Sequence, residues 1–217
     1  MKITTCLSMA ASLTISPALA NSCAPFPSSI VSFSSDFKQP ELPLVKSEFQ
    51  TQFVQHKWQV KQSKACLTAT RNQNLSHITT GYIVNSPSKG FVRVDQANDE
   101  GFGTSLFNYA NVTQDGQVDN ILRMYTANST TPDIWQGYVN SNFPIFQEDI
   151  LVQAGAVFSG LVKRTFWAGQ VAAWNIMYQG VIPVTVFVNT CNVVVGYDYF
   201  APVERTRVIT EFFDLKA

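Results

Sequence analysis

The sequence offers few side chains that could act as catalysts. Its two histidines, His56 and His77, belong to no His-Glu-x-x-His pattern, and no Gly-x-Ser-x-Gly nucleophile motif is present. We expect His56 to cap the carbonyl groups of a short helix and His77 to be a solvated turn residue. A zinc site would need more ligands than these two side chains and a few cysteines. We therefore expect no catalytic residue, no metal ion, no other cofactor and no enzymatic activity.

Acidic side chains leave one alternative open, an extracellular hydrolase. The acidic pair at 148–149 and Asp198 could supply two carboxylates for glycoside hydrolysis. Their ordinary roles would be surface solvation for the pair and a strand-end hydrogen bond for Asp198. Arg205, Arg207 and Glu211 share one face of the last expected strand, where ion pairing across strands is the ordinary explanation.

The N-terminus has the pattern of a cleavable secretory signal peptide. Lys2 precedes an apolar stretch from Cys6 to Ala20, and small residues precede the expected cleavage site after Ala20. The apolar stretch is short for a membrane span, which needs roughly 20 residues. We expect residues 1–20 to be removed, leaving a secreted, extracellular protein with no integral membrane segment.

The mature chain would keep three cysteines, Cys23, Cys66 and Cys191. An odd number in an oxidising compartment predicts one disulfide and one remaining thiol. Cys66 and Cys191 lie in strand-like surroundings far apart in sequence, so we expect them to pair, with a stabilisation of about 4 to 5 kcal/mol. The sequence leaves Cys23 open as a partner of either.

The composition argues against nucleic acid and for buried or bound apolar surface. Fifteen basic and fifteen acidic residues give zero net charge, without a basic stripe that could neutralise phosphates. Only 14% of the 217 residues are charged, whereas 46% are hydrophobic and 16 are Phe. An average soluble domain has about 25% charged residues. The apolar excess must be buried in a core or used to bind a ligand.

Hydrophobic periodicity divides the mature chain into a leader and one domain. Residues 21–43 contain several Pro and Ser and predict an extended leader, and residues 44–217 predict a single β domain. Val45, Phe49 and Phe53 recur at i, i+4 among polar residues, which predicts a short amphipathic helix.

Beyond the helix, short segments rich in β-branched and aromatic residues alternate with turn signals. They predict an irregular first strand over 57–70, loops over 128–149, and strands at 78–84, 91–96, 104–112, 118–126, 156–162, 170–178, 181–189, 193–200 and 203–213. The fold class is mainly β: an antiparallel curved sheet or incomplete β-barrel, with the short N-terminal amphipathic helix as its lid. A closed barrel and a two-sheet sandwich remain alternatives.

Several of these segments resemble the LolA-like lipoprotein-carrier superfamily, which includes ependymin-like secreted relatives. The resemblance lies in Phe49-x-x-x-Phe53-x-Gln55, Gly81-Tyr82-Ile83, Ser86-Pro87-x-x-Gly90-Phe91-x-Arg93-Val94-Asp95, and 120–126. It implies an incomplete antiparallel barrel with a helical lid that holds acyl chains or other amphiphiles. The cysteines, the 128–149 insertion and the Trp-rich second half differ from the bacterial carriers.

The aromatic residues suggest what the domain does. We expect a non-enzymatic protein that binds a hydrophobic small molecule or lipid on the concave face of the sheet, using Phe49, Phe53, Trp58, Phe91, Phe107, Tyr125 and Trp174. The alternative is a secreted interaction protein with a filled core, whose loops recognise a protein partner. Three sequons predict N-glycosylation at Asn74, Asn111 and Asn128.

Overall fold

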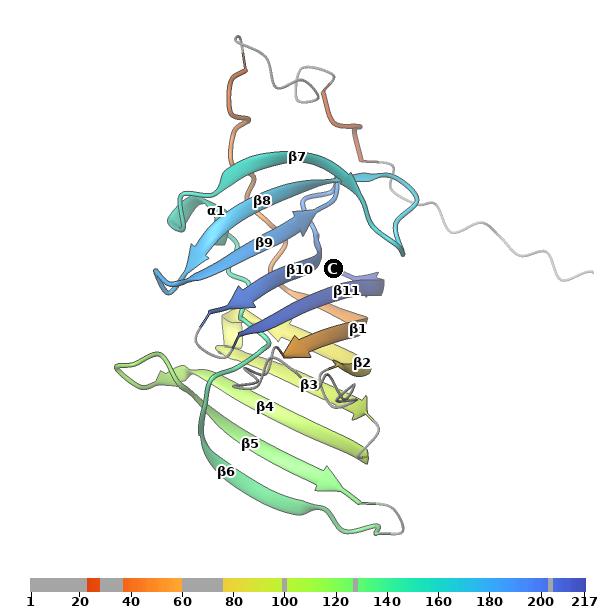
Figure 1. Ribbon diagram of the computed structural model, residues 1–217, viewed down its shortest axis with the longest axis vertical. Coiled ribbons are helices and arrows are strands. Elements are labelled where there is room, and N and C mark those ends of the chain that lie inside the picture. Colours follow the sequence, from red (N-terminus) through yellow and green to blue (C-terminus); the bar gives the residue numbers. More distant parts are fainter. Residues whose placement is uncertain (1–22, 28–36, 60–75, 99–100, 127–128, 203–204) are drawn as a thin grey trace, which may run out of the picture.

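The computed structural model describes residues 23–27, 37–59, 76–98, 101–126, 129–202 and 205–217. They form one antiparallel sheet of 11 strands in the order β6-β5-β4-β3-β2-β1-β11-β10-β9-β8-β7, which is not closed into a barrel (Figure 1). The expected mainly β class with an open, antiparallel sheet is confirmed.

The sheet consists of two consecutive meanders joined along β1 and β11. The first contains β1 (Phe49–Gln59), β2 (Ser76–Ser86), β3 (Phe91–Asn98), β4 (Gly101–Val112), β5 (Val118–Tyr125) and β6 (Asp133–Val139). The second contains β7 (Val157–Lys163), β8 (Gln170–Tyr178), β9 (Ile182–Val188), β10 (Val194–Ala201) and β11 (Thr206–Lys216). Two short helices, η3 (Pro87–Lys89) and α1 (Ile150–Gln153), complete the described elements. Because β1 pairs with β11, the first and last strands join the two halves.

The expected amphipathic helix lid is wrong, because Phe49 begins strand β1. Phe49, Thr51, Phe53 and Gln55 are all buried, so every second residue of this segment faces inward. The two phenylalanines are four residues apart, a spacing that satisfies both a helix and alternate positions of a strand. The buried polar residues between and after them hid the strand pattern. Both have partners: Thr51 donates to the Phe213 carbonyl oxygen at 2.8 Å and Gln55 donates to Thr210 Oγ1 at 3.0 Å.

The segment expected to be loops contains β6 and continues into a chain that crosses the concave face of the sheet. We call residues 140–156 the crossing segment. Phe143, Phe146 and Leu151 of this segment are 4%, 1% and 0% exposed and belong to the main core. Phe143 meets Phe53 of β1 edge to face, with ring centroids 5.2 Å apart. Part of the core is thus supplied by the connection between the two meanders.

A smaller cluster covers the other face of β8–β10. Val171, Ala173, Phe187 and Val195 are buried there, and the half-buried Trp167 packs against them. The Trp167 indole nitrogen donates to the Phe212 carbonyl oxygen at 3.1 Å, which fixes the loop between β7 and β8 on this face. Part of β8–β10 is therefore buried on both faces, as the neighbouring residues Val171 and Ala172 show.

The N-terminal residues are attached to the second meander. Phe37 stacks on Phe158, and Lys46 bridges to Val193 in parallel. The disulfide joins Cys23 to Cys191, so the expected Cys66–Cys191 pair is wrong. Strand-like surroundings alone do not predict which two distant cysteines pair, because the pairing also depends on the position of the leader, which contains Cys23.

Some expectations fall outside the described residues. These are the signal peptide, Cys66, Asn74, Asn128 and most of the irregular first strand. Within the described part of the chain, no helix has the length and hydropathy to cross a membrane.

Candidate functional site

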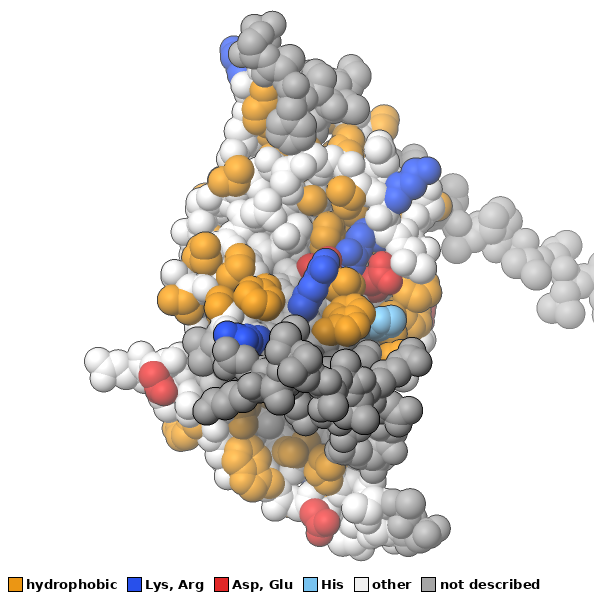
Figure 2. All heavy atoms as spheres, in the orientation of Figure 1, with side chains coloured by type: hydrophobic (Ala, Val, Ile, Leu, Met, Phe, Trp, Pro, Cys, Tyr) orange, Lys and Arg blue, Asp and Glu red, His pale blue; other side chains and the backbone are white. Residues whose placement is uncertain are grey.

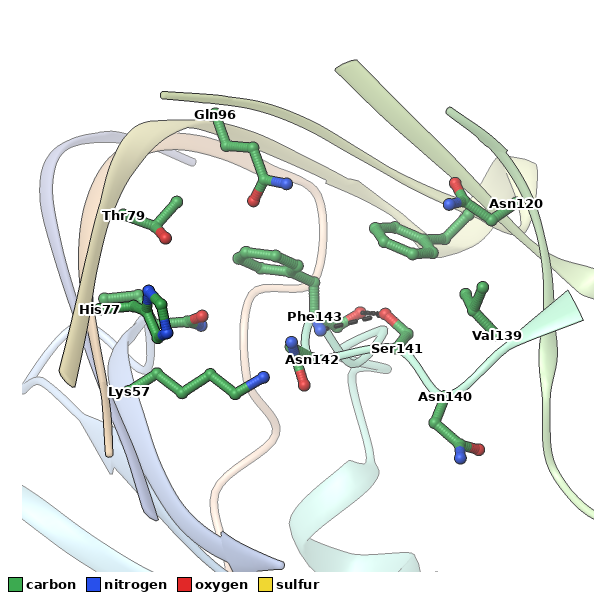
Figure 3. Close-up of a pocket in the computed structure, with 12 residues that line it drawn as sticks. Lys57, His77, Thr79, Gln96, Asn120, Val139, Asn140, Ser141, Asn142 and Phe143 are labelled. Carbon is green, nitrogen blue, oxygen red and sulfur yellow. Dashed lines mark hydrogen bonds between the residues drawn. The ribbon is translucent and has the colours of Figure 1, made fainter. Parts of the chain in front are cut away.

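Two hollows lie beside residues 140–142, where the crossing segment leaves β6. The polar hollow has a volume of about 330 Å³ and is lined mainly by amide and hydroxyl side chains from β1–β5 (Figure 3). The tyrosine hollow has a volume of about 620 Å³ and is lined by Tyr109, Tyr178 and Tyr199 together with aliphatic residues. Ligand sites commonly measure about 300–1,000 Å³. The two hollows share Lys57, Asn140, Ser141 and Asn142.

Tyrosines from the sheet hold the crossing segment between the hollows. Tyr197 donates to the Asn142 carbonyl oxygen at 2.6 Å, and Tyr199 donates to Asn142 Oδ1 at 2.7 Å. From the other meander, Tyr109 donates to the Phe143 carbonyl oxygen at 2.5 Å. Strands of the two meanders therefore fix two adjacent residues of the crossing segment, Asn142 from β10 and Phe143 from β4, and the walls of the hollows are set by tertiary contacts.

The polar hollow contains a buried acceptor without a partner in the described part of the chain. Asn120 of β5 is 4% exposed, and none of the described residues donates a hydrogen bond to its side-chain oxygen. Gln96 and Thr79 line the same wall, and Lys57 and His77 lie at the opposite end from Asn120 (Figure 3). Leaving a buried acceptor unpaired costs about 1–3 kcal/mol. Such a group marks a place where a ligand donor could bind.

The tyrosine hollow combines apolar walls with phenol groups. Val118, Ile182 and Ala201 contribute apolar surface. Burial raises the pKa of Tyr178, and burial together with the nearby Tyr178 raises that of Tyr109 well above its usual range. Both phenols therefore remain protonated near neutral pH and cannot serve as bases. Tyr109 already donates its proton to the Phe143 carbonyl oxygen, so Tyr178 is the one of the two that can donate to a ligand.

Charge in the two hollows is sparse. Among the described residues that line them, Lys57 is the only Lys, Arg, Asp or Glu residue; His77 also lines the polar hollow. A lone cation at the junction of the hollows favours a neutral or anionic ligand over a cationic one.

The apolar concave face is largely filled by the chain itself. The space enclosed by Phe146, Ile176, Val184, Val186 and Tyr197 amounts to only about 40 Å³. A large apolar guest has no room there, so any ligand of this face must use the two open hollows.

The aromatic residues expected to bind a ligand are divided between three environments. Phe49, Phe53 and Trp174 are buried in the main core. Phe107 lines the polar hollow. The strand registers place the remaining three on the convex face, away from the hollows: Trp58, Phe91 and Tyr125. Of the seven, only Phe107 faces a hollow, because the others were chosen for residue type without a firm strand parity.

The charged residues considered for catalysis are separated and carry structural contacts. Asp198 is bound by both terminal nitrogens of Arg164 at 3.2 Å, and Arg164 Nε lies 3.4 Å from Glu211. Burial raises the pKa of Asp198, and the Arg164 charge opposes this increase. Asp149 accepts a hydrogen bond from Gln153 of the crossing segment. Of the charged residues of the last strand that were expected to pair across strands, Glu211 pairs with Arg164, which lies in the loop between β7 and β8.

Of the residues that line the two hollows, sequence reasoning selected only Phe107 for ligand binding; it missed Asn120 among others, and it missed Trp135 on the neighbouring strand β6. Asn120 sits among apolar inward positions of β5, and Trp135 lies in a segment expected to be a loop. A polar residue at an inward position of a strand was the available signal for Asn120. Among the described residues, no three of His, Cys, Asp and Glu come together as a metal site. Asn111, the one sequon asparagine described, is exposed and hydrogen bonds Asp119 and Tyr138.

Comparisons with known proteins returned no match, either to a protein-family model or to a curated protein.

Proposed function

We propose that this protein is secreted and binds an amphiphilic ligand, such as a lipid, in the tyrosine hollow on the concave face of the sheet. The observation that carries this proposal is the open volume of about 620 Å³ with apolar walls and the phenol of Tyr178 as a hydrogen-bond donor. Apolar groups of a ligand would contact Val118, Ile182 and Ala201, at about 0.8 kcal/mol per buried methylene. The Cys23–Cys191 disulfide is in keeping with an extracellular location.

Lys57 determines the orientation that we expect for the bound ligand. It lies where the two hollows adjoin, so a ligand whose apolar part occupies the tyrosine hollow would bring its polar head close to the ammonium group. An anionic head is favoured there over a neutral one, because the described lining residues include no carboxylate. The role in this proposal is binding or carriage, in line with the resemblance to LolA-like carriers.

Titration of the delipidated protein with cis-parinaric acid and with its methyl ester tests this proposal. We expect saturable fluorescence enhancement with both probes and tighter binding of the acid. Lys57→Gln should remove the difference between acid and ester. Ile182→Glu should weaken both, because a carboxylate would line the apolar wall. Met177→Glu is the matched control: Met177 is 54% exposed and lies outside both hollows, so binding should be unchanged.

The result that overturns this function is an absence of saturable binding of both probes to the unaltered protein. Binding that is equally strong in Ile182→Glu would also overturn it, since the ligand would then lie elsewhere.

A second candidate function is recognition of a protein partner through the loops. It is favoured by the filled concave core, where only about 40 Å³ remains between the crossing segment and β8–β10. The parinaric acid titration separates the two candidates, because a protein that acts only through its loops would bind neither probe.

A further inference from the structure

Trp135 forms an exposed aromatic platform next to the polar hollow. The residue lies on β6 with 45% of its surface exposed. Its indole covers Gly137: a Cβ at residue 137 would lie 2.6 Å from Trp135 Cζ2 and 2.8 Å from Cη2. One ring face therefore rests on the strand, and a glycine is required beneath it. The other face is left for contact with a ligand.

The strand register connects this platform with the unpaired acceptor. Gly137 pairs with Asn120 and Trp135 pairs with Leu122, so the indole and the Asn120 amide lie on the same face of neighbouring strands. Asn120 points into the polar hollow at the end opposite Lys57 and His77 (Figure 3). Its side-chain oxygen is buried and accepts no hydrogen bond from the residues that the structure describes. A flat apolar surface and a buried acceptor thus adjoin within one site.

We propose that Trp135 and the polar hollow form a binding site for a neutral saccharide. A pyranose ring has an apolar C–H face that stacks on an aromatic ring and hydroxyl groups along its edge. Those hydroxyls match the side chains that line the hollow, since amides such as Gln96, Asn120 and Asn140 both donate and accept hydrogen bonds. A sugar hydroxyl would supply the donor that Asn120 lacks. The described lining residues include no acidic side chain, and Lys57 and His77 lie at the end of the hollow away from Asn120, so the amide-lined end near Asn120 suits an uncharged ligand (Figure 3).

This site adjoins the proposed amphiphile site at Lys57 and residues 140–142 but relies on Asn120 and Trp135, which do not line the tyrosine hollow. The hollow of about 330 Å³ is open to solvent and is bounded by Val139, which lies on the same face of β6 as Trp135. We therefore expect one sugar to enter the hollow while the next stacks on the indole.

Isothermal titration calorimetry of the full chain with four trisaccharides tests the proposal: maltotriose, cellotriose, mannotriose and chitotriose. We expect saturable binding of at least one of them at millimolar concentration or below. Trp135→Ala should weaken this binding by about tenfold or more, which corresponds to about 1.4 kcal/mol. Gly137→Val should weaken it as well, since the branched side chain displaces the indole.

Asn120→Leu separates a ligand-binding role from a structural one. If the unpaired oxygen serves a ligand, this variant loses saccharide binding while its melting temperature stays equal or rises, because an unsatisfied buried acceptor has been removed. Ile134→Ala is the matched control on the opposite face of β6: Ile134 is 66% exposed, and its loss should leave saccharide affinity unchanged.

Three results would overturn the proposal. The first is that none of the four sugars binds the unaltered protein. The second is that Trp135→Ala or Asn120→Leu binds the sugar as tightly as the unaltered protein does. The third is that Asn120→Leu lowers the melting temperature, because the amide would then serve the fold.

Discussion

The side-chain amide of Asn85 pairs with the backbone of Phe146 as a neighbouring strand would. Asn85 Nδ2 donates to the Phe146 carbonyl oxygen at 2.9 Å, and Asn85 Oδ1 accepts from the Phe146 amide at 3.0 Å. Nδ2 also donates to the carbonyl oxygen of Ser47. A single residue that is 1% exposed therefore anchors both the crossing segment and the chain before β1 to the sheet.

Asn85→Leu should be strongly destabilising. The substitution keeps the side-chain volume but leaves the buried amide and carbonyl of Phe146 without partners, at a cost of about 3 kcal/mol. Urea unfolding would measure the loss, and faster hydrogen exchange over residues 140–156 would locate it. Asn175→Leu serves as control, because Asn175 is exposed and its side chain accepts one hydrogen bond from the described residues, that of the Thr185 hydroxyl. Equal loss in the two variants would contradict the anchoring role.

The Cys23–Cys191 disulfide should contribute to stability through chain entropy. The two residues are 168 positions apart, and closing a loop of that length predicts a stabilisation of about 5 kcal/mol. We expect the double variant Cys23→Ser/Cys191→Ser to unfold at a much lower urea concentration. Cys66→Ser provides the comparison and should retain a Cys23–Cys191 peptide in non-reducing mass spectrometry. A Cys66-containing disulfide peptide in the unaltered protein would refute this pairing.

Arg164 is expected to contribute more to the stability of the fold than the exposed arginine Arg93. Its side chain is 10% exposed, contacts Asp198 and Glu211, and stacks on the Phe187 ring at 4.0 Å. On the face seen in Figure 2, basic and acidic side chains gather over β10 and β11 among hydrophobic ones. Arg164→Ala leaves two carboxylates without their cation, which should cost about 3 kcal/mol or more.

The matched control for this prediction is Arg93→Ala. Arg93 is 52% exposed and pairs with Asp95 at 2.9 Å, and exposed pairs contribute about 1 kcal/mol or less. Thermal unfolding of the two variants at neutral pH gives the comparison. Similar melting temperatures for both would show that the buried pair contributes no more than the exposed one.

Buried tyrosines should make the fold sensitive to alkaline pH. Burial raises the pKa of Tyr109, Tyr178 and Tyr197 above the ordinary value of 10.0. A phenol whose pKa is higher in the folded state adds stability below pH 10.0, and this stability is lost as pH rises toward the folded-state value. We therefore expect cooperative unfolding above about pH 10, with a late phase in the phenolate absorbance at 295 nm that coincides with it.

Tyr178→Phe tests the cause of this alkaline sensitivity. Removing one raised phenol should move the unfolding midpoint to higher pH, because fewer buried groups must ionise. An unchanged midpoint would mean that other groups control the transition.

The sequence predicted the class of fold because strand signals are local. Alternating apolar residues and turn dipeptides located most of the second meander and β2–β5 within a few residues. The prediction failed where two periodicities coincide, as at Phe49 and Phe53, whose spacing satisfies both a helix and a strand. It also failed at β6, because glycine and exposed aromatics give an edge strand little alternation.

Residue type alone predicted little of the site. Burial of an aromatic side chain and its exposure to a hollow depend on tertiary contacts, so Phe53 and Trp174 are core residues although both are large and apolar. Asn120 and Asn85 are both buried asparagines on inward positions. They differ in their contact with the crossing segment. Asn85 Oδ1 accepts a hydrogen bond from the Phe146 amide of that segment, whereas none of the described residues donates to Asn120 Oδ1.

The pairing of β1 with β11 has a consequence for biosynthesis. Each meander is built from neighbouring segments and can form as soon as its own strands have been translated, but β1 and β10 expose open edges until β11 is available. A nascent chain would therefore carry the open edge of β1 from the time the first meander is translated, and the open edge of β10 as well once that strand has been made, until β11 follows. Deletion of β11 should leave this state permanent, so a protein shortened by its last strand should aggregate by edge-to-edge association.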